Sequence, residues 1–341
     1  MIYISLGLFF LISAFLEFIS KKNIQTNVLF IILCIILVLF AGLRSEIGSD
    51  WFAYFNYYSN NTGNFEFGYS EISKLFHQLH FHYNIFLIFI NFISILLIGI
   101  SIYKHSRITI FPLLLFFSNL YLYYNFSGMR QAVAISFTCF ALNYAYNRNF
   151  LLFFLFVFFA FLFHSTAIVF LLVYFLPRKT INFKHLLILI LIFIGLYTIK
   201  EKLFFALAEF KDVNFYTVVQ EKSDSIITEF YIGALVRLLL IFVIIAFARK
   251  MLENVKFIYF FNIYIFGIFL FMSTYLISPD IGVRLSSYFT IIDIFLLGNI
   301  LSSVNFRKKL AISMLYSIII FYKLSWYSGI DSYYYKTIFN L

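Results

Sequence analysis

Isolated arginines at the ends of apolar stretches are the first residues in this sequence that could do chemistry. Arg130 stands at the start of the apolar stretch 131–147, and Arg284 stands at the start of 285–304. The first turn of a helix presents unpaired N–H groups and a partial positive charge, so an added guanidinium makes it a binding site for phosphate or pyrophosphate. The structural alternative is that each arginine reaches to lipid headgroups.

Two further arginines extend this pattern. Arg44 lies at the end of the second apolar stretch, and Arg237 lies inside a later one, roughly 10–12 Å below its outer end by the helical rise per residue. A lone charge at that depth costs about 2.5–3.5 kcal/mol or more. Because Asp293 lies at the same depth, a structural ion pair is the alternative to a substrate role for Arg237. Together the arginines indicate an anionic ligand that arrives from the outer side.

The pair His164-Ser165 divides the long apolar segment 150–176 into two halves. Non-helical backbone at membrane depth occurs only where protein or a water-filled cavity covers it. If the helix breaks here, the titratable ring of His164 faces such a cavity. If the helix is continuous, the ring is an ordinary hydrogen-bonded side chain.

The polar segment after the second apolar stretch holds acidic residues among aromatic ones. Asp50 is followed by Trp51 and Tyr54, and Glu66 is followed by Tyr69. This grouping is compatible with a binding site. The alternative is a solvated loop whose aromatic side chains lie at the membrane interface.

The composition indicates that membrane helices position these side chains. The chain has 341 residues, of which 63% are hydrophobic and 12% charged, and its mean hydropathy is +0.95. A soluble domain carries about twice that share of charged residues. A soluble, disordered or disulfide-scaffold chain is therefore excluded. We expect the net charge of +10 to orient the chain in the membrane, and we expect no nucleic-acid partner.

Apolar segment lengths predict the architecture. Crossing roughly 30 Å of hydrocarbon takes about 20 mostly apolar residues. The sequence predicts an all-α polytopic integral membrane protein, one membrane domain over 1–341, with about ten transmembrane helices and a re-entrant helix pair at 150–176. The expected spans lie at about 1–20, 27–43, 84–103, 108–124, 131–147, 186–199, 230–248, 257–278, 285–304 and 310–327.

Basic residues predict the orientation of these spans, because Lys and Arg mark the cytoplasmic side. With Lys21 and Lys22 inside, 44–82 is an outer loop, and so is 200–229, which carries an amphipathic stretch. A single crossing by 150–176 would place the later basic clusters outside. We therefore expect this segment to enter and return on the cytoplasmic side. The alternative is one long tilted helix with a local exception to the charge rule.

Several kinds of active site are missing from the sequence. It contains no G-x-x-x-x-G-K-[ST] phosphate loop, H-E-x-x-H zinc helix, paired C-x-x-C, G-x-G-x-x-G or Asp-x-Asp motif. These absences disfavour a nucleotide-driven pump and a zinc enzyme. We expect neither a metal nor a cofactor.

Five short motifs, in order along the chain, resemble the EpsG family of Wzy-like exopolysaccharide and O-antigen polymerases. They are Arg44 with Gly48-Ser49-Asp50 and Tyr54, then Glu66-x-Gly68-Tyr69, Met129-Arg130-Gln131-Ala132 with Ala134, His164-Ser165, and Arg284 with Tyr288. The resemblance covers residues 42 to 290, which is most of the chain. Ser49 and Trp51 stand where much of the family carries Thr and Tyr.

The resemblance implies a GT-C-like membrane glycosyltransferase of the bacterial cell (inner) membrane, with its active site toward the periplasm or exterior. The implied substrate is an oligosaccharide repeat unit on undecaprenyl pyrophosphate. The growing glycan passes from this carrier to the non-reducing end of a new lipid-linked unit, by a metal-independent, inverting displacement. The product is an exopolysaccharide, capsule or O-antigen. Other expected partners are membrane lipids, a flippase and a chain-length regulator protein.

This reaction gives each candidate residue a role. A pyrophosphate leaving group is stabilised by preorganised cations, for which the candidates, in order of preference, are Arg130, Arg284, Arg44 and Arg237. The acceptor hydroxyl needs a general base, for which the unranked candidates are Asp50, Glu66 and His164. The candidates for sugar binding are Trp51, Tyr54, Tyr69 and Gln131.

Two other functions fit the same residues. A flippase or exporter of lipid-linked oligosaccharide would use the same cations, but it needs a through-path and two alternating states. Because the predicted cations cluster in the outer half, they favour the enzyme. The second alternative is a related transferase, such as an O-antigen ligase or a membrane acyltransferase.

Overall fold

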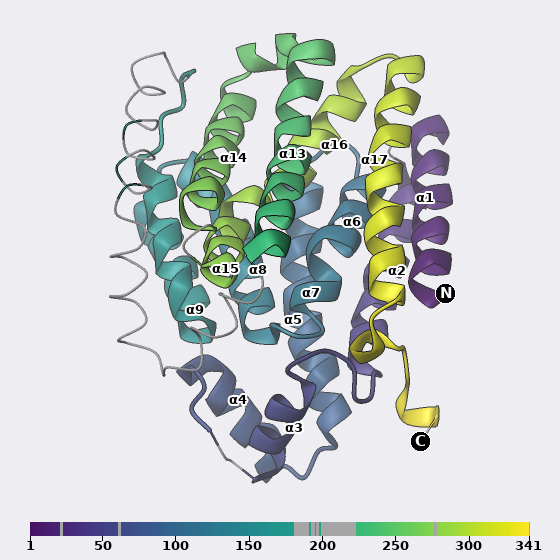
Figure 1. Ribbon diagram of the computed structural model, residues 1–341, viewed down its shortest axis with the longest axis vertical. Helices are drawn as coiled ribbons and strands as arrows, with labels where there is room; N and C mark the ends of the chain where they lie inside the picture. Colours follow the sequence, from purple (N-terminus) through teal and green to yellow (C-terminus); the bar gives the residue numbers. More distant parts are fainter. Residues whose placement is uncertain are drawn as a thin grey trace. The chain divides into compact units, whose positions relative to one another are not determined.

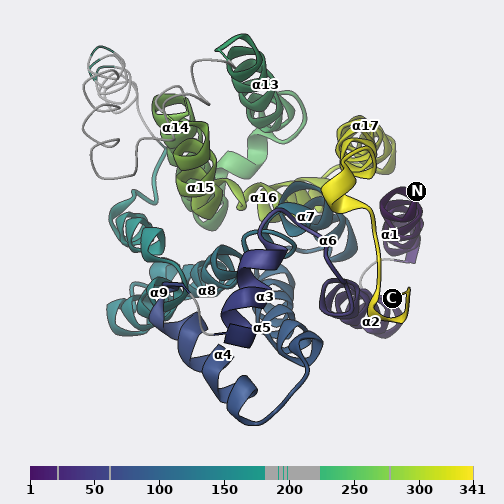
Figure 2. The same ribbon diagram turned by 60° about the horizontal axis from the view of Figure 1, so that its bottom comes forward.

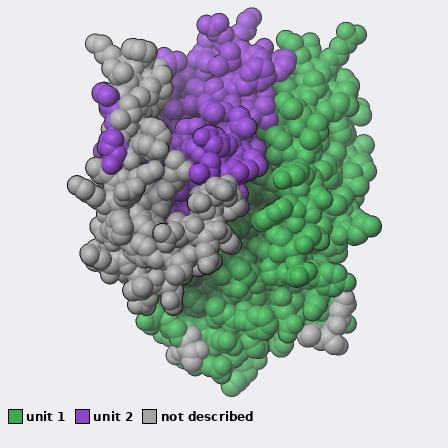
Figure 3. Space-filling view, viewed as in Figure 1, with its two compact units in different colours: residues 1–174, 294–341 green, residues 175–293 purple. Residues whose placement is uncertain are grey.

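The computed structural model describes residues 1–20, 23–60, 63–180, 223–275 and 278–340, together with positions 191, 195 and 198. In this part of the chain there are fourteen α-helices, joined by short 3-10 and π segments. The predicted all-α class is confirmed. The chain divides into two compact units, residues 1–174 with 294–341 and residues 175–293 (Figure 3).

The first unit contains most of the helices (Figure 1). They are α1 (Ile2–Ser20), α2 (Ile24–Gly42), α3 (Trp51–Asn60), α4 (Phe67–Gln78), α5 (Tyr83–His105), α6 (Ile110–Phe116), a π segment (Phe117–Tyr121), α7 (Leu122–Tyr124), α8 (Met129–Tyr146), α9 (Phe150–Phe163), α16 (Asp293–Ser303) and α17 (Phe306–Ser328). A 3-10 helix (Ser165–Phe175) follows α9, and two 3-10 turns (Asp331–Tyr333 and Ile338–Asn340) follow α17.

The second unit contains α13 (Ser223–Phe247), a 3-10 segment (Arg249–Glu253), α14 (Val255–Thr274) and α15 (Pro279–Thr290). Helix α15 packs on α14. Gly267 permits this contact, because a Cβ there would lie only 3.0 Å from the Thr290 nitrogen.

Six described helices are long and apolar enough to cross a membrane: α1, α2, α5, α14, α17 and residues 227–247 of α13. The bent pair of α15 and α16 makes up to seven. The chain is therefore a multi-pass membrane protein, whereas the predicted total of about ten spans is not shown. The expected span 186–199 and most of the loop 200–229 lie outside the described residues.

Two expected spans take a different form. The segment 108–124 is interrupted by the π segment, which leaves shorter helical pieces. The segment 285–304 is also divided, because α15 ends at Thr290 and α16 begins at Asp293. Arg284 consequently lies within α15 rather than at the start of a helix, which corrects the sequence-based placement.

The segment 150–176 folds back on itself. Helix α9 ends at Phe163, and His164 has extended backbone angles, φ −156° and ψ 116°. The two ends of the segment meet: Tyr174 donates from its hydroxyl to the Arg148 carbonyl at 3.1 Å, and its ring lies 5.2 Å from that of Phe150. The predicted break and return of the chain are present. The position of this hairpin in a membrane stays a prediction.

Helices α3 and α4 lie across one end of the α5, α8 and α9 helices (Figures 1 and 2). Aromatic rings hold them there. The ring centroid of Tyr69 lies 5.3 Å from that of Tyr54 and 5.4 Å from that of Phe86 on α5. The expected loop 44–82 is therefore a small helical layer with a packed aromatic core.

The C-terminal segment fixes the turn that precedes α3. The Ser45 N–H donates to the Lys336 carbonyl at 3.0 Å, and the Gly48 N–H donates to the Ser332 carbonyl at 2.9 Å. Gly48 has φ +100°, and a Cβ there would overlap the carbonyl oxygen of Phe126. Only glycine fits this position without strain, because it needs both a positive φ and a close backbone approach.

Candidate functional site

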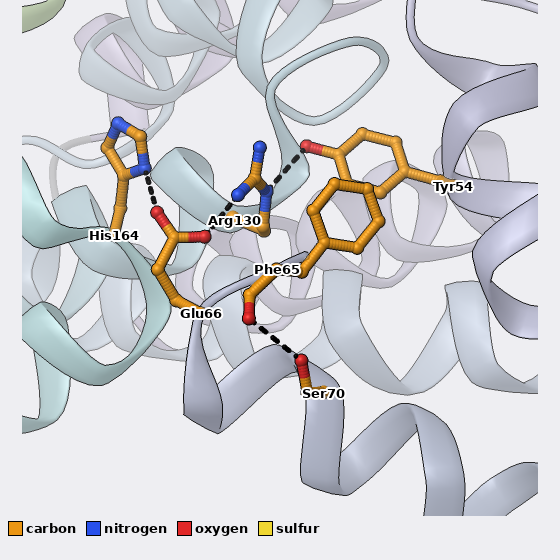
Figure 4. Close-up of polar contacts among 6 residues, drawn as sticks. All are labelled: Tyr54, Phe65, Glu66, Ser70, Arg130 and His164. Carbon is orange, nitrogen blue, oxygen red and sulfur yellow. Dashed lines mark hydrogen bonds and ion pairs between the residues drawn. The ribbon is translucent and has the colours of Figure 1, made fainter. Parts of the chain in front are cut away.

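A carboxylate at the edge of the α3 and α4 layer holds two of the predicted functional residues. One oxygen of Glu66 accepts from Arg130 Nη1, and the other lies 2.9 Å from Nδ1 of His164 (Figure 4). These three side chains come from separate segments of the first unit. We call this set the Glu66 cluster.

The α8–α9 hairpin brings Arg130 and His164 to the same end. Arg130 is the second residue of α8, and His164 follows the last residue of α9. Two packed helices joined by a short turn run antiparallel, so the start of the first lies beside the end of the second. The rings of Phe137 and Phe163, stacked with centroids 5.9 Å apart, hold the helices together at this end.

The N-terminus of α4 brings Glu66 to the hairpin. Glu66 is the N-cap residue of α4, but its side chain makes no capping hydrogen bond, so the carboxylate is available to other segments. Gly68 allows the close approach, because a Cβ there would lie 3.0 Å from the carbonyl oxygen of Leu162 at the end of α9. Ser70 fixes the preceding turn by donating to the Phe65 carbonyl at 3.0 Å.

Aromatic rings orient the guanidinium of Arg130. Its Nε donates to the Tyr54 hydroxyl at 3.3 Å, and its Cζ lies 4.3 Å from the ring centroid of Phe65. Nη2 makes no hydrogen bond to any described residue. The side chain is 22% exposed, and no side chain caps the α8 N-terminus. The guanidinium edge and the first N–H groups of the helix can therefore serve one anion.

The ionisation of Glu66 is set by three opposing effects. Burial of the carboxylate raises its pKa, but the hydrogen bond from His164 and the positive charge of Arg130 outweigh burial and hold the pKa at about 2. Glu66 is therefore ionised at neutral pH. With such a low pKa and both oxygens engaged, it is a weak proton acceptor.

The ionised carboxylate selects the tautomer of His164. Glu66 can only accept, so the ring nitrogen that faces it, Nδ1, carries a hydrogen. In a neutral ring this leaves the lone pair on Nε2. That atom is buried and has no hydrogen-bond partner among the described residues. A buried acceptor without a partner fits the position of a proton-accepting base.

The other acidic candidate, Asp50, lies apart from the Glu66 cluster. It precedes α3, where its carboxylate accepts from the Ser49 hydroxyl at 2.9 Å. That is its one side-chain hydrogen bond within the part of the chain that the structure describes. The geometry therefore favours His164 as base and Glu66 as the group that positions it.

Arg44 is fully buried, with 0% of its surface exposed. Its Nη2 donates to the Phe126 carbonyl at 3.2 Å, Nη1 donates to the Ala41 carbonyl, and its Cζ lies 5.0 Å from the Phe126 ring centroid. The guanidinium thus ties the end of α2 to the turn before α8. We leave Arg44 out of the proposed ligands, because a bound anion would have to displace these contacts.

The four residues predicted to bind sugar are all buried. Trp51 is 7% exposed, Tyr54 2%, Tyr69 0% and Gln131 3%. Rings cover the aromatic faces, as in the stacking of Trp51 on Phe55 at 4.9 Å. These aromatics form the core under α3 and α4, so we do not assign sugar stacking to them.

The remaining two arginines lie in the second unit. Arg284 donates from Nε to Asp280 one turn earlier at 2.7 Å, and both side chains are more than a third exposed. Arg237 donates to the Gly233 carbonyl at 3.0 Å, and its Cζ stands 3.8 Å from the ring centroid of Phe271. Each arginine is held by its own unit, and its role in ligand binding stays a prediction.

Two contributors were missed at the sequence level. Phe65 stacks under Arg130, and its position directly before Glu66 was the available signal. The C-terminal segment holds the turn at Gly48 through backbone bonds, which carry no side-chain signal. Among the described residues, no group of three or more His, Cys, Asp or Glu side chains is placed to hold a metal ion.

Comparison with known proteins gives one match. The family model of the EpsG family matches residues 27–340, which is most of the chain and includes the whole Glu66 cluster. Neither the curated proteins nor the solved structures that were searched contain a match. The chain therefore belongs to the EpsG family of membrane proteins, a family linked to exopolysaccharide biosynthesis.

Proposed function

We propose that this protein is a polysaccharide polymerase that transfers a growing glycan from undecaprenyl pyrophosphate to the non-reducing end of a new lipid-linked repeat unit, on the outer face of a bacterial cell membrane. The observation that carries the proposal is the two-sided contact of Glu66, which holds a cation and an oriented histidine in one place. Membership of the EpsG family supports the substrate class.

In the proposed reaction, His164 is the general base. The acceptor hydroxyl donates its proton to Nε2 as its oxygen attacks the anomeric carbon of the growing glycan, and the bond from that carbon to the pyrophosphate breaks. One such displacement inverts the anomeric configuration. Glu66 keeps Nδ1 protonated and stabilises the imidazolium that forms, as a carboxylate beside a catalytic histidine does.

Arg130 stabilises the leaving group. Its free Nη2 edge and the uncapped start of α8 together bind the pyrophosphate oxygens, where negative charge grows as the bond breaks. Phe65 and Tyr54 limit the motion of the guanidinium, so little reorganisation is needed during the reaction. Arg284 and Arg237 remain candidates for further phosphate contacts, and the proposal does not require them.

The test supplies purified protein with lipid-linked repeat units in detergent or liposomes. We expect longer glycans to form without any nucleotide sugar, and undecaprenyl pyrophosphate to be released in step with each transfer. Movement of the intact unit across liposomes with no longer glycan would overturn the proposal in favour of a carrier. Transfer of glycan or acyl groups to another acceptor would favour the related transferases.

A further inference from the structure

An apolar groove of about 450 Å³ lies along α2 and α5 in the first unit, away from the Glu66 cluster. We propose that this groove binds an acyl chain of an anionic phospholipid, whose phosphate lies at Lys104. The inference is independent of the proposed enzymatic function.

The walls of the groove are suited to a hydrocarbon chain. They include Phe30, Ile31, Phe92 and Leu96, and three of these four side chains are about half exposed: Ile31 57%, Phe92 49% and Leu96 45%. Gly99 forms part of the floor, because a Cβ there would lie 3.5 Å from the sulfur of Cys34. The missing side chain thus leaves space between two tightly packed helices.

The groove has a cation at one end only. Lys104 lies in the last turn of α5, and the neighbouring lining residue Asn27 lies in the first turn of α2. The rest of the lining is apolar apart from the phenol of Tyr103. An apolar channel that ends at an exposed lysine matches a lipid with a long apolar chain and an anionic headgroup.

This end of the unit carries further positive charge. Arg107 is exposed two residues after α5, and the ammonium group of Lys309 lies 5.2 Å from the ring centroid of Phe18 at the end of α1. Clustered basic residues at one end of a membrane helix bundle attract anionic lipids, by about 1 kcal/mol per residue. The surroundings of Lys104 therefore favour an anionic headgroup over a zwitterionic one.

The direction of the groove excludes the lipid carrier of the proposed reaction as its occupant. The opposite end of α5 packs against the layer of the Glu66 cluster, where Asn84 donates to the Arg44 carbonyl at 3.0 Å. Asn84 and Lys104 are about 30 Å apart along the helix. A pyrophosphate at Arg130 would place its lipid tail at the other end of the unit from the phosphate that Lys104 binds.

Cys34 provides the test, because its sulfur lines the groove and the only other cysteine, Cys139, is buried in α8. In Cys139→Ala protein in detergent, we would measure alkylation of Cys34 by N-ethylmaleimide while adding palmitoyl-oleoyl phosphatidylglycerol or phosphatidylcholine. We expect phosphatidylglycerol to protect Cys34 at lower concentration. Equal protection by the two lipids, or none by either, would overturn the proposal.

Two pairs of variants locate the lipid. Lys104→Gln should raise the concentration of phosphatidylglycerol needed for protection about fivefold, with no change for phosphatidylcholine, whereas the nearby Arg107→Gln should have a smaller effect. Gly99→Leu fills the floor and should weaken both lipids, whereas Gly99→Ala should leave both almost unchanged. If Arg107→Gln matches Lys104→Gln, or if Lys104→Gln keeps the full lipid preference, the headgroup site is not at Lys104.

Discussion

Glu66 Oε1 lies 2.9 Å from Nδ1 of His164, although 98 residues separate them in the sequence. The contact joins the start of α4 to the break after α9, and the second oxygen of the same carboxylate holds Arg130. A single side chain therefore orders both the base and the cation of the proposed reaction. This arrangement predicts that the three residues act as a unit.

Replacing His164 with glutamine should lower the rate of glycan elongation by about 10²–10⁴-fold, because general-base catalysis contributes that much. Glutamine keeps a hydrogen-bonding side chain beside Glu66 but has no titratable nitrogen. The measurement is elongation of lipid-linked units at saturating substrate. The matched control is His80→Asn, since His80 is exposed with φ +57°, a conformation that asparagine tolerates. A His164→Gln protein as active as the control would rule out this base.

Replacing Arg130 with lysine should lower elongation by about 10²-fold, in the range found when a donor to a developing anion is lost. Lysine keeps the charge but loses the planar fork that bonds Tyr54 and Glu66 while leaving Nη2 for a phosphate. Arg107→Lys, at the other end of α5, is the control and should be active. If Arg130→Lys elongates normally, bidentate phosphate binding by this residue is wrong.

The sequence predicted the cluster residues for reasons that the structure makes clear. Arg130 follows the turn that opens α8, and the charge count of the basic clusters required the return at His164, so both followed from patterns that are local or one-dimensional. Their contact with Glu66 could not be predicted, because it depends on how α4 packs on the end of α9 at Gly68. Such packing leaves no periodic signal in the sequence.

Arg44 shows the opposite limit. In the sequence it is an arginine at a helix end beside polar residues, which is equally typical of an anion site and of a buried anchor. The structure satisfies its guanidinium with backbone carbonyls, including that of Phe126, which is 82 residues away. Which carbonyls converge on a buried arginine is decided by tertiary packing. The aromatic candidates Tyr54 and Tyr69 were misleading for the same reason, because core rings and interfacial rings share one composition.

The low pKa of Glu66 predicts a pH-dependent stability. Because the pKa is about 2 in the folded protein and 4.5 ordinarily, the stabilisation is complete above pH 4.5 and is lost as the pH falls toward 2. We expect the wild-type protein to lose about 2 kcal/mol more than Glu66→Gln between pH 5 and pH 3. Thermal unfolding in detergent at both pH values measures the difference.

The control for this pH dependence is Glu71→Gln. Glu71 pairs with Lys74 at 2.9 Å, but both side chains are about half exposed, so the pair contributes little. Glu71→Gln should follow the wild-type pH dependence. A Glu66→Gln protein with that same dependence would show that the carboxylate is not held ionised by its partners.

The turn before α3 should be intolerant of a Cβ at Gly48. Gly48→Ala has to adopt φ +100° and must also displace the Phe126 carbonyl. Gly63 is a close comparison, because it has φ +122° but its nearest neighbour would be a Tyr57 ring atom at 3.7 Å. We expect Gly63→Ala to cost about 1–2 kcal/mol from backbone strain, and Gly48→Ala to cost about 1–3 kcal/mol more from overpacking. Similar melting temperatures for the two variants would contradict the proposed clash.

Glu17 should stabilise the start of α6, a role that its position near the expected inner interface did not indicate. It is 1% exposed, and its carboxylate accepts from the Thr109 N–H at 2.7 Å, the Thr109 hydroxyl at 2.9 Å and the Ile110 N–H at 2.9 Å. Since hydrogen bonds to a buried charge are worth about 1.5–3 kcal/mol each, Glu17→Gln should cost at least about 2 kcal/mol. Thr109→Val removes only the hydroxyl bond and should cost less, and Ser20→Ala, at an exposed hydroxyl, should have almost no effect. Unfolding temperatures in one detergent rank the three variants, and a Glu17→Gln protein as stable as Ser20→Ala would mean that water replaces the carboxylate at α6.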